Sequence, residues 1–149
     1  MKKDNYIYEC IAEAQKAYKK NEVPIGAIIV KNGKIIARAY NKREHSQNAL
    51  HHAEIIAIDK ACKKTKSWRL DDCEMFVSLE PCPMCAGAIL NARLKKVSIL
   101  CLDNNHGAVM SKYHLLNDNV LNHTTQVEYI ENLEAKNLIQ LFFKMIRKK

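Results

Sequence analysis

The chain has 149 residues, 48% of them hydrophobic, which suits one compact core and is too short for two ordinary domains, so we expect a single domain over residues 1–149. No apolar run approaches the roughly 20 residues of a membrane span and the first residues do not resemble a secretory signal, which predicts a cytoplasmic protein with no membrane partner. In that reducing compartment the six cysteines favour metal binding or catalysis over disulfides, and a formal net charge of +8 favours a polyanionic partner.

The first part of the chain predicts a helix followed by a β-hairpin. Apolar residues recur at three- and four-residue steps over residues 6–18, the pattern of an amphipathic helix. Two β-rich runs follow at residues 27–30 and 34–40. They flank an Asn32-Gly33 pair, which suits the tight turn of a hairpin.

The middle of the chain alternates helices with strands. A largely apolar helix is expected from about residue 53 to residue 62, and it ends in the basic stretch 63–66, which is favourable at the negative end of a helix. A strand at residues 75–79 precedes a helix at residues 82–92, and another strand is expected at residues 97–102.

The last part predicts loops, a strand and a helix. Residues 103–125 are rich in Asn, His and Gly, which predicts loops around a short helical segment at residues 113–116. A strand near residues 126–130 and an amphipathic helix from about Glu134 complete the pattern. Strands that alternate with helices predict an α/β fold, with a mixed or largely parallel sheet covered on both faces and its sites at the strand ends.

Cys82 and Cys85 have the spacing of metal ligands. On the first turn of a helix their sulfurs lie about 60° apart on one face, close enough to share a metal ion. The positive end of the helix also stabilises thiolate over thiol. A closed structural zinc site needs four protein ligands, so one such pair must recruit others or leave the site open to water.

His52 and Glu54 supply a third ligand and a proton carrier. His52 stands at the start of the predicted helix, and Glu54 follows two residues later. Zinc lowers the pKa of a bound water to about 7, which makes attack on an electrophilic ring carbon feasible at neutral pH. Deamination also needs a carboxylate that moves protons from the water to the ring nitrogen and then to the leaving amine, so we expect Glu54 to be a catalytic residue and not a ligand.

The motifs His52-Ala53-Glu54 and Pro81-Cys82-Pro83-Met84-Cys85 together form the signature of zinc-dependent nucleobase deaminases. Further segments extend the match over nearly the whole chain: Glu22-Val23-Pro24-Ile25-Gly26-Ala27, Asn41, Trp68-Arg69-Leu70, Leu79-Glu80, Ala86-Gly87-Ala88, Asp103, Asn122-His123 and Phe142-Phe143. With these segments the chain resembles the bacterial tRNA-specific adenosine deaminases, which are part of the cytidine/deoxycytidylate deaminase superfamily.

The resemblance implies a fold, a metal and a reaction. The implied fold is a three-layer α/β/α, cytidine-deaminase-like arrangement with a mixed five-stranded sheet, assembled as a homodimer. The implied cofactor is one Zn²⁺ per subunit, held by His52, Cys82 and Cys85. The implied reaction is hydrolytic deamination of the wobble adenosine of a tRNA anticodon to inosine, so the tRNA anticodon loop is the expected partner.

The resemblance also implies substrate contacts. Asn41 would hydrogen-bond the flipped base, and the backbone of Cys82 would lie near the attacked carbon. The other implied substrate-binding residues, in the pocket or against neighbouring nucleotides, are Ala53, Asp103 and Asn122. The outer face of the basic C-terminal helix would meet phosphates of the anticodon loop.

Several of these features have simpler interpretations. A lone Cys-x-x-Cys pair can be a redox dithiol, and His51 competes with His52 as a ligand until the His-x-Glu spacing is considered. Asparagine and aspartate often only cap or bridge loops, which is the alternative for the three polar residues Asn41, Asp103 and Asn122. The remaining cysteines are most simply small core hydrophobes: Cys10, Cys62, Cys73 and Cys101.

Two other functions stay open. The same zinc chemistry serves deaminases of free bases or nucleosides such as guanine or cytidine. A basic RNA-binding module with zinc as a structural staple is the alternative outside enzymes, and it would require a fourth protein ligand.

Overall fold

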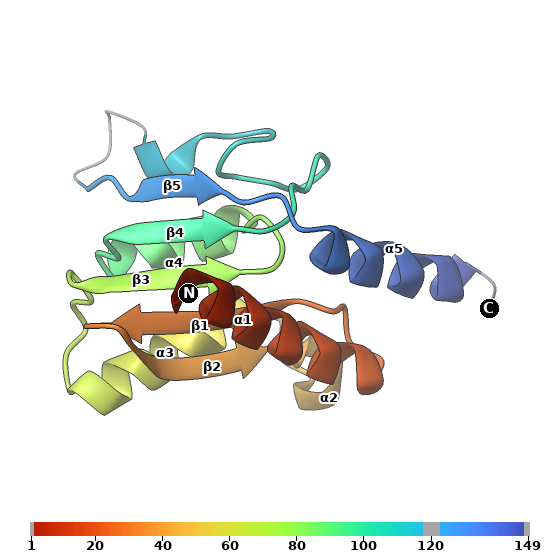
Figure 1. The fold of residues 1–149 in the computed structure, drawn as a ribbon, viewed down its shortest axis with the longest axis horizontal. Helices are drawn as coiled ribbons and strands as arrows, with labels where there is room; N and C mark the ends of the chain where they lie inside the picture. Colours follow the sequence, from red (N-terminus) through yellow and green to blue (C-terminus); the bar gives the residue numbers. More distant parts are fainter. Residues whose placement is uncertain (1, 118–122, 148–149) are drawn as a thin grey trace.

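A five-stranded sheet forms the centre of the protein in the computed structural model, which describes residues 2–117 and 123–147. Its order is β2-β1-β3-β4-β5 (Figure 1). The bounds of the strands are β1 (Gly26–Lys31), β2 (Lys34–Tyr40), β3 (Cys73–Val77), β4 (Lys96–Ile99) and β5 (Gln126–Tyr129). β1 is antiparallel to both β2 and β3, whereas β3, β4 and β5 are parallel to one another, so the sheet is mixed, as expected.

Helices cover both faces of this sheet. Helix α1 (Lys2–Lys19) lies in front of the sheet in Figure 1, and α3 (Ala53–Thr65) and α4 (Pro83–Asn91) lie behind it. Helix α5 (Leu133–Arg147) lies beside α1, where the Gln15 side-chain amide donates a hydrogen bond of 3.1 Å to Glu134. The three-layer α/β/α arrangement is therefore confirmed. Among the described residues, no helix has the length and apolar character needed to cross a membrane.

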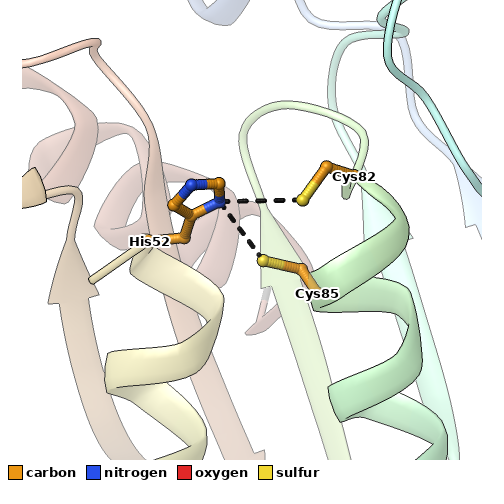
Figure 2. Close-up of side chains that lie close together, drawn as sticks. All are labelled: His52, Cys82 and Cys85. Carbon is orange, nitrogen blue, oxygen red and sulfur yellow. Dashed lines mark hydrogen bonds between the residues drawn. The ribbon is translucent and has the colours of Figure 1, made fainter. Parts of the chain in front are cut away.

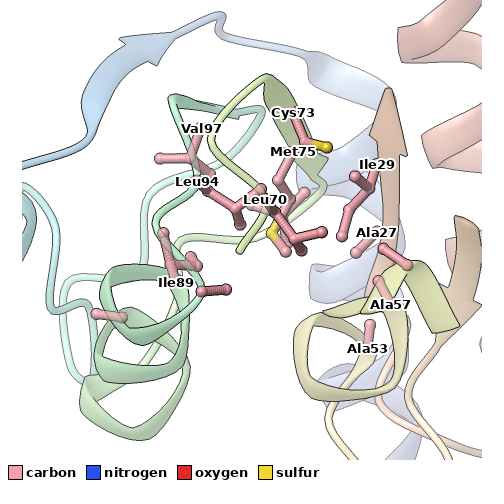
Figure 3. Packing of buried hydrophobic residues seen from close by; sticks show 14 of the residues in the cluster. Ala27, Ile29, Ala53, Ala57, Leu70, Cys73, Met75, Ile89, Leu94 and Val97 are labelled. Atoms are coloured by element: carbon pink, nitrogen blue, oxygen red, sulfur yellow. The ribbon is translucent and has the colours of Figure 1, made fainter. Parts of the chain in front are cut away.

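The core is divided between the two faces by the alternation of side chains along the strands. On the side of α3 and α4, Ala27 and Ile29 of β1 pack with Met75, Ala57 and Ile89 (Figure 3). On the side of α1, the cluster contains Cys10, Ile28, Phe76, Leu100 and Ala135. Because β1 is buried on both faces, it is apolar almost throughout instead of alternating with polar residues.

Close packing places α1 directly on the start of β1. A Cβ atom on Gly26 would overlap the backbone of α1 at Cys10 and Ala14, so only glycine allows this approach. The predicted hairpin is also confirmed: Asn32 (φ 51°) and Gly33 (φ 76°) both take the left-handed conformation between paired strands.

Several element boundaries and one short helix differ from the predictions. Strand β4 ends at Ile99, three residues before the predicted residue 102, and the short helical segment lies at Leu115–Asn117 instead of residues 113–116. Strand β3 covers Cys73–Val77 and ends two residues before the predicted residue 79, because the chain turns there toward α4. A short helix, α2 (Arg43–Ser46), was not predicted. Its N-terminal amides at Glu44 and His45 donate to the carboxylate of Glu22, a partner that local sequence patterns do not reveal.

Candidate active site

Two helices on the same side of the sheet begin at the candidate site. His52 is the N-cap of α3 and Cys82 is the N-cap of α4, and both have extended backbone conformations. Neither side chain caps its own helix, so each is free to turn toward the other helix. Pro83 at the start of α4 suits this position because its missing N–H is not needed there.

The three predicted ligands converge on one point (Figure 2). Nδ1 of His52 lies 3.7 Å from Sγ of Cys82 and 3.5 Å from Sγ of Cys85, and all three donor atoms lie within 4.8 Å of one another. Zinc–ligand bonds of 2.0–2.3 Å at tetrahedral angles would place such atoms about 3.5 Å apart. The donor set therefore fits zinc. His51 is not part of it, and its carbonyl accepts a hydrogen bond from the N–H of Lys42.

The cysteine pair is poised to bind a cation. Hydrogen bonds from the Cys85 thiol and from His52 lower the pKa of Cys82 to about 4. The neighbouring Cys82 thiolate and burial raise the pKa of Cys85. The pair therefore favours one thiolate, at Cys82, and a divalent cation would favour a second thiolate at Cys85 and release its proton. Cys82 and Cys85 thus have the properties of a pair of metal ligands, and His52 faces them.

Glu54 lies beside the donor atoms without being one of them. It is in the first turn of α3 and is only 3% exposed. Within the described residues its Oε1 atom has no hydrogen-bond partner, and the metal-ligand cluster does not include it. Burial raises the pKa of the Glu54 carboxyl to about 7, although its own backbone N–H and His52 favour the carboxylate. A buried carboxyl group that titrates near neutrality can both accept and donate a proton.

On the α3 side, the segment that contains Asn41 adjoins the residue before His52. Asn41 is buried, its side-chain NH₂ donates to the carbonyl of Val23 at 3.3 Å, and its Oδ1 accepts the N–H of Arg43 at 3.1 Å. The next residue, Lys42, donates its N–H to His51, so this segment adjoins His52. In this structure Asn41 therefore bridges loops. Ala53, the first residue of α3, is fully buried.

On the α4 side, Asp103 lies in the loop that follows β4. Its Oδ1 accepts the N–H groups of Asn105 and His106, both at 3.1 Å, so the side chain organises a turn. Its own N–H donates to Glu80 at 3.0 Å. Asn122, another predicted substrate contact, lies outside the described residues.

Two buried carboxylates of the site were missed by the sequence analysis. Glu22 and Glu80 are 1% and 3% exposed, and each binds backbone N–H groups of a segment next to a metal ligand. In each case the sequence offers one signal, an acidic residue directly before a motif. Glu22 precedes Val23-Pro24, and Glu80 precedes Pro81-Cys82. The other cysteines carry free thiols, as expected: Cys10 and Cys73 are buried, and Cys62 and Cys101 are half-buried.

The fold and the donor set define a deaminase, and comparison with known proteins agrees: residues 1–147 match the MafB19-like deaminase family. A tRNA-specific adenosine deaminase from Bacillus subtilis (strain 168) is 44% identical over 145 residues, which cover 97% of this chain and 90% of that protein. The chain therefore belongs to the family of the tRNA-specific adenosine deaminases.

Comparison with solved structures also favours the tRNA deaminases, by TM-score and by sequence identity. A structure from a study of A-to-I editing by tRNA:A34 deaminases at the wobble position matches with a TM-score of 0.87 and 32% identity, over 91% of this chain and 99% of that one. A guanine deaminase from Bacillus subtilis matches with a TM-score of 0.65 and 30% identity, over 95% and 93% of the two chains. The likeness to the tRNA deaminase is therefore greater than the likeness to an enzyme of a free base.

Proposed function

We propose that this protein hydrolyses the exocyclic amine of the wobble adenosine in a tRNA anticodon and so produces inosine and ammonia. The observation that carries the proposal is the convergence of His52, Cys82 and Cys85 beside the buried Glu54. The similarity to tRNA-specific adenosine deaminases over nearly the full chain supports tRNA over a free base as the substrate.

One Zn²⁺ per subunit is the proposed cofactor, with His52, Cys82 and Cys85 as its ligands. The near-tetrahedral separation of their donor atoms supports this choice, as does the mixture of one imidazole and two sulfur ligands. Zinc at such a site would supply an activated water through its open fourth position. The same donor set argues against a purely structural staple, because a fourth protein ligand is absent from the cluster formed by the described residues.

Glu54 is the proposed catalytic residue. Its carboxylate would take a proton from the attacking water, deliver it to N1 of adenine, and then move a second proton to the departing amine. Water adds at C6, the C6–N6 bond breaks, and ammonia leaves. A pKa of about 7 serves both directions of transfer, because neither protonation state is strongly favoured at neutral pH.

The substrate contacts remain proposals that rest on the family resemblance: Asn41, Ala53, Asp103 and Asn122. Asn41 directly precedes Lys42, whose N–H donates a hydrogen bond to His51. This neighbourhood supports the placement of Asn41 at the pocket. Its second amide hydrogen and second oxygen lone pair stay available for an adenine that has been turned out of its stack. The net charge of +8 supports binding of the anticodon loop through its phosphates.

We further propose that residues 1–149 act as one domain in the cytoplasm and that the partner subunit is a second copy of the chain. A groove of about 600 Å³ between α3 and α4 supports the dimer. It is lined by Ile55, Ile58 and the indole of Trp68, which is 60% exposed. Apolar surface of this kind usually marks an interaction site. Sedimentation of the purified protein would test the assembly.

The decisive experiment is incubation of the zinc-loaded protein with an anticodon stem-loop that carries a wobble adenosine, followed by nucleoside analysis. Inosine is the expected product. Glu54→Ala should abolish its formation while the zinc content stays at one ion per chain. Full turnover by this variant would show that the proton relay is wrong. Ammonia from free guanine or cytidine, without inosine in the RNA, would instead favour a free-base deaminase.

A further inference from the structure

The carboxylate of Glu80 accepts several backbone hydrogen bonds from one loop. Its Oε2 atom accepts the N–H groups of Val109, Met110 and Ser111 at 3.1, 2.7 and 2.9 Å. Its Oε1 atom accepts the N–H of Asp103 at 3.0 Å and the hydroxyl of Ser111. These five bonds span both ends of residues 103–111, which we call the rim loop.

The rim loop lies at the edge of the candidate active site. It follows β4, and the segment with Cys82 follows the neighbouring parallel strand β3, so both leave the sheet at its carboxyl edge, where ligands of such sheets bind. The N–H of Ala108 donates to the carbonyl of Pro81 at 2.9 Å, which joins the loop to the residue before Cys82. We therefore expect a large substrate of the metal site to contact this loop.

The contact between Glu80 and the rim loop leaves no spare volume. A Cβ atom on Gly107 would overlap all three atoms of the Glu80 carboxyl group. Among the described residues, no lysine or arginine forms an ion pair with this buried carboxylate, so backbone dipoles and one hydroxyl stabilise its charge. Such a buried charge is satisfied only when the loop keeps one conformation.

We propose that Glu80 is a positioning residue for substrate binding, which holds the rim loop in the conformation that the RNA meets beside Cys82. It acts through the loop and does not contact the reacting atoms. The benefit is that the loop is ordered before the substrate arrives, so binding does not have to order it. This inference rests on the proposed function, because it takes an RNA loop as the substrate.

Glu80→Gln is the principal test. Glutamine has the same shape, but in either orientation its NH₂ group faces N–H donors that the carboxylate accepts. We expect the KM for the anticodon stem-loop to rise by about tenfold or more, the factor for a lost hydrogen bond to a charged group. The zinc content should stay unchanged, and kcat should change much less than KM.

Glu13→Gln is the matched control. Glu13 is also buried and lies in α1, on the other side of the sheet, where it pairs with Lys16 at 2.7 Å. It should reproduce any general loss of stability without the change in KM. Equal changes in KM for Glu13→Gln and Glu80→Gln would overturn the proposal.

Gly107→Ala tests the same contact from the loop side. The added methyl group must displace the loop from Glu80, so this variant should raise KM as Glu80→Gln does. The double variant should be little worse than either single one, because the two changes break one interaction. Multiplied effects on KM in the double variant would contradict the proposal.

Hydrogen exchange separates this inference from the proposed function. In Glu80→Gln, the amides of Val109, Met110 and Ser111 should exchange about tenfold faster or more, because their acceptor is weakened. Unchanged protection would show that Glu80 does not hold the loop, whatever the activity. If the wild-type protein makes no inosine, the substrate role falls with the proposed function, and exchange alone decides whether the loop depends on Glu80.

Discussion

Two segments flank the candidate metal ligands, and each is held by a buried carboxylate. On the α3 side, Glu22 accepts the N–H groups of Glu44 and His45 at 3.0 and 2.7 Å and contacts Nδ1 of His45 at 2.8 Å. On the α4 side, Glu80 accepts four N–H groups and one hydroxyl from the rim loop. A buried carboxylate that accepts backbone N–H groups therefore occurs on both sides of the site.

The two carboxylates differ in how directly they are coupled to the metal ligands. Glu80 is separated from Cys82 by one proline, so the rim loop and the ligand share a rigid support. Glu22 lies before β1 and is joined to His52 through α2 and the hydrogen bond from Lys42 to His51. We conclude that the α4 side is built as one unit with the metal site, whereas the α3 side is joined to it by longer connections.

Removal of the metal should have the largest effect, because it is the link that both sides share. His52 comes from one side and Cys82 and Cys85 from the other, so chelation should abolish inosine formation. It should also lower Tm by several degrees, as expected when a ligand that binds only the folded state is lost. Added zinc should restore both quantities. Activity of a preparation shown to be metal-free by atomic absorption would refute the metal assignment.

Acid should weaken both segments, and the comparison predicts that the rim loop contributes more. Burial opposes ionisation, yet hydrogen bonds keep the pKa values of Glu22 and Glu80 below their ordinary value of 4.5. A depressed pKa in the folded state gives stability that is present above pH about 5 and is lost as the pH falls through the folded pKa. Urea unfolding of metal-free protein from pH 7 to pH 3 should show this loss.

Comparison of the variants Glu80→Gln and Glu22→Gln measures how much each segment contributes to the acid dependence of stability. Each should flatten the curve of unfolding free energy against pH, and Glu80→Gln should flatten it more because its carboxylate accepts more hydrogen bonds. An unchanged pH dependence in both variants would mean that other groups cause the acid sensitivity.

Side-chain donors should give the smallest effects. Ser111→Ala removes one hydroxyl bond to the buried Glu80, which should cost about 1–2 kcal/mol of unfolding free energy. His45→Gln removes the imidazole that contacts Glu22. Because the His45 side chain is 59% exposed, this change should lower the unfolding free energy by less than about 1 kcal/mol. Both are measured by urea unfolding at pH 7. A larger cost for His45→Gln would reverse the comparison between the two sides.

Features that depend on short spacing could be predicted from the order of residues along the chain. The three-residue spacing of Cys82 and Cys85, the His-x-Glu motif and the Asn32-Gly33 turn each act within one turn of helix or one hairpin, and the structure places them as predicted. The order of helices and strands also follows from local hydrophobic periods. The mixed sheet was expected from this alternation and from the family resemblance.

The contacts that hold the site together become visible only in the folded chain. The bonds of Glu22 and Glu80 join residues that are 22 to 31 positions apart, so no local pattern contains both partners. The same holds for Asn41, whose side chain meets Val23 across 18 positions. Such contacts form only after the strands have brought these segments to one edge of the sheet, because the satisfaction of a buried polar group depends on what is nearby in space and not along the chain.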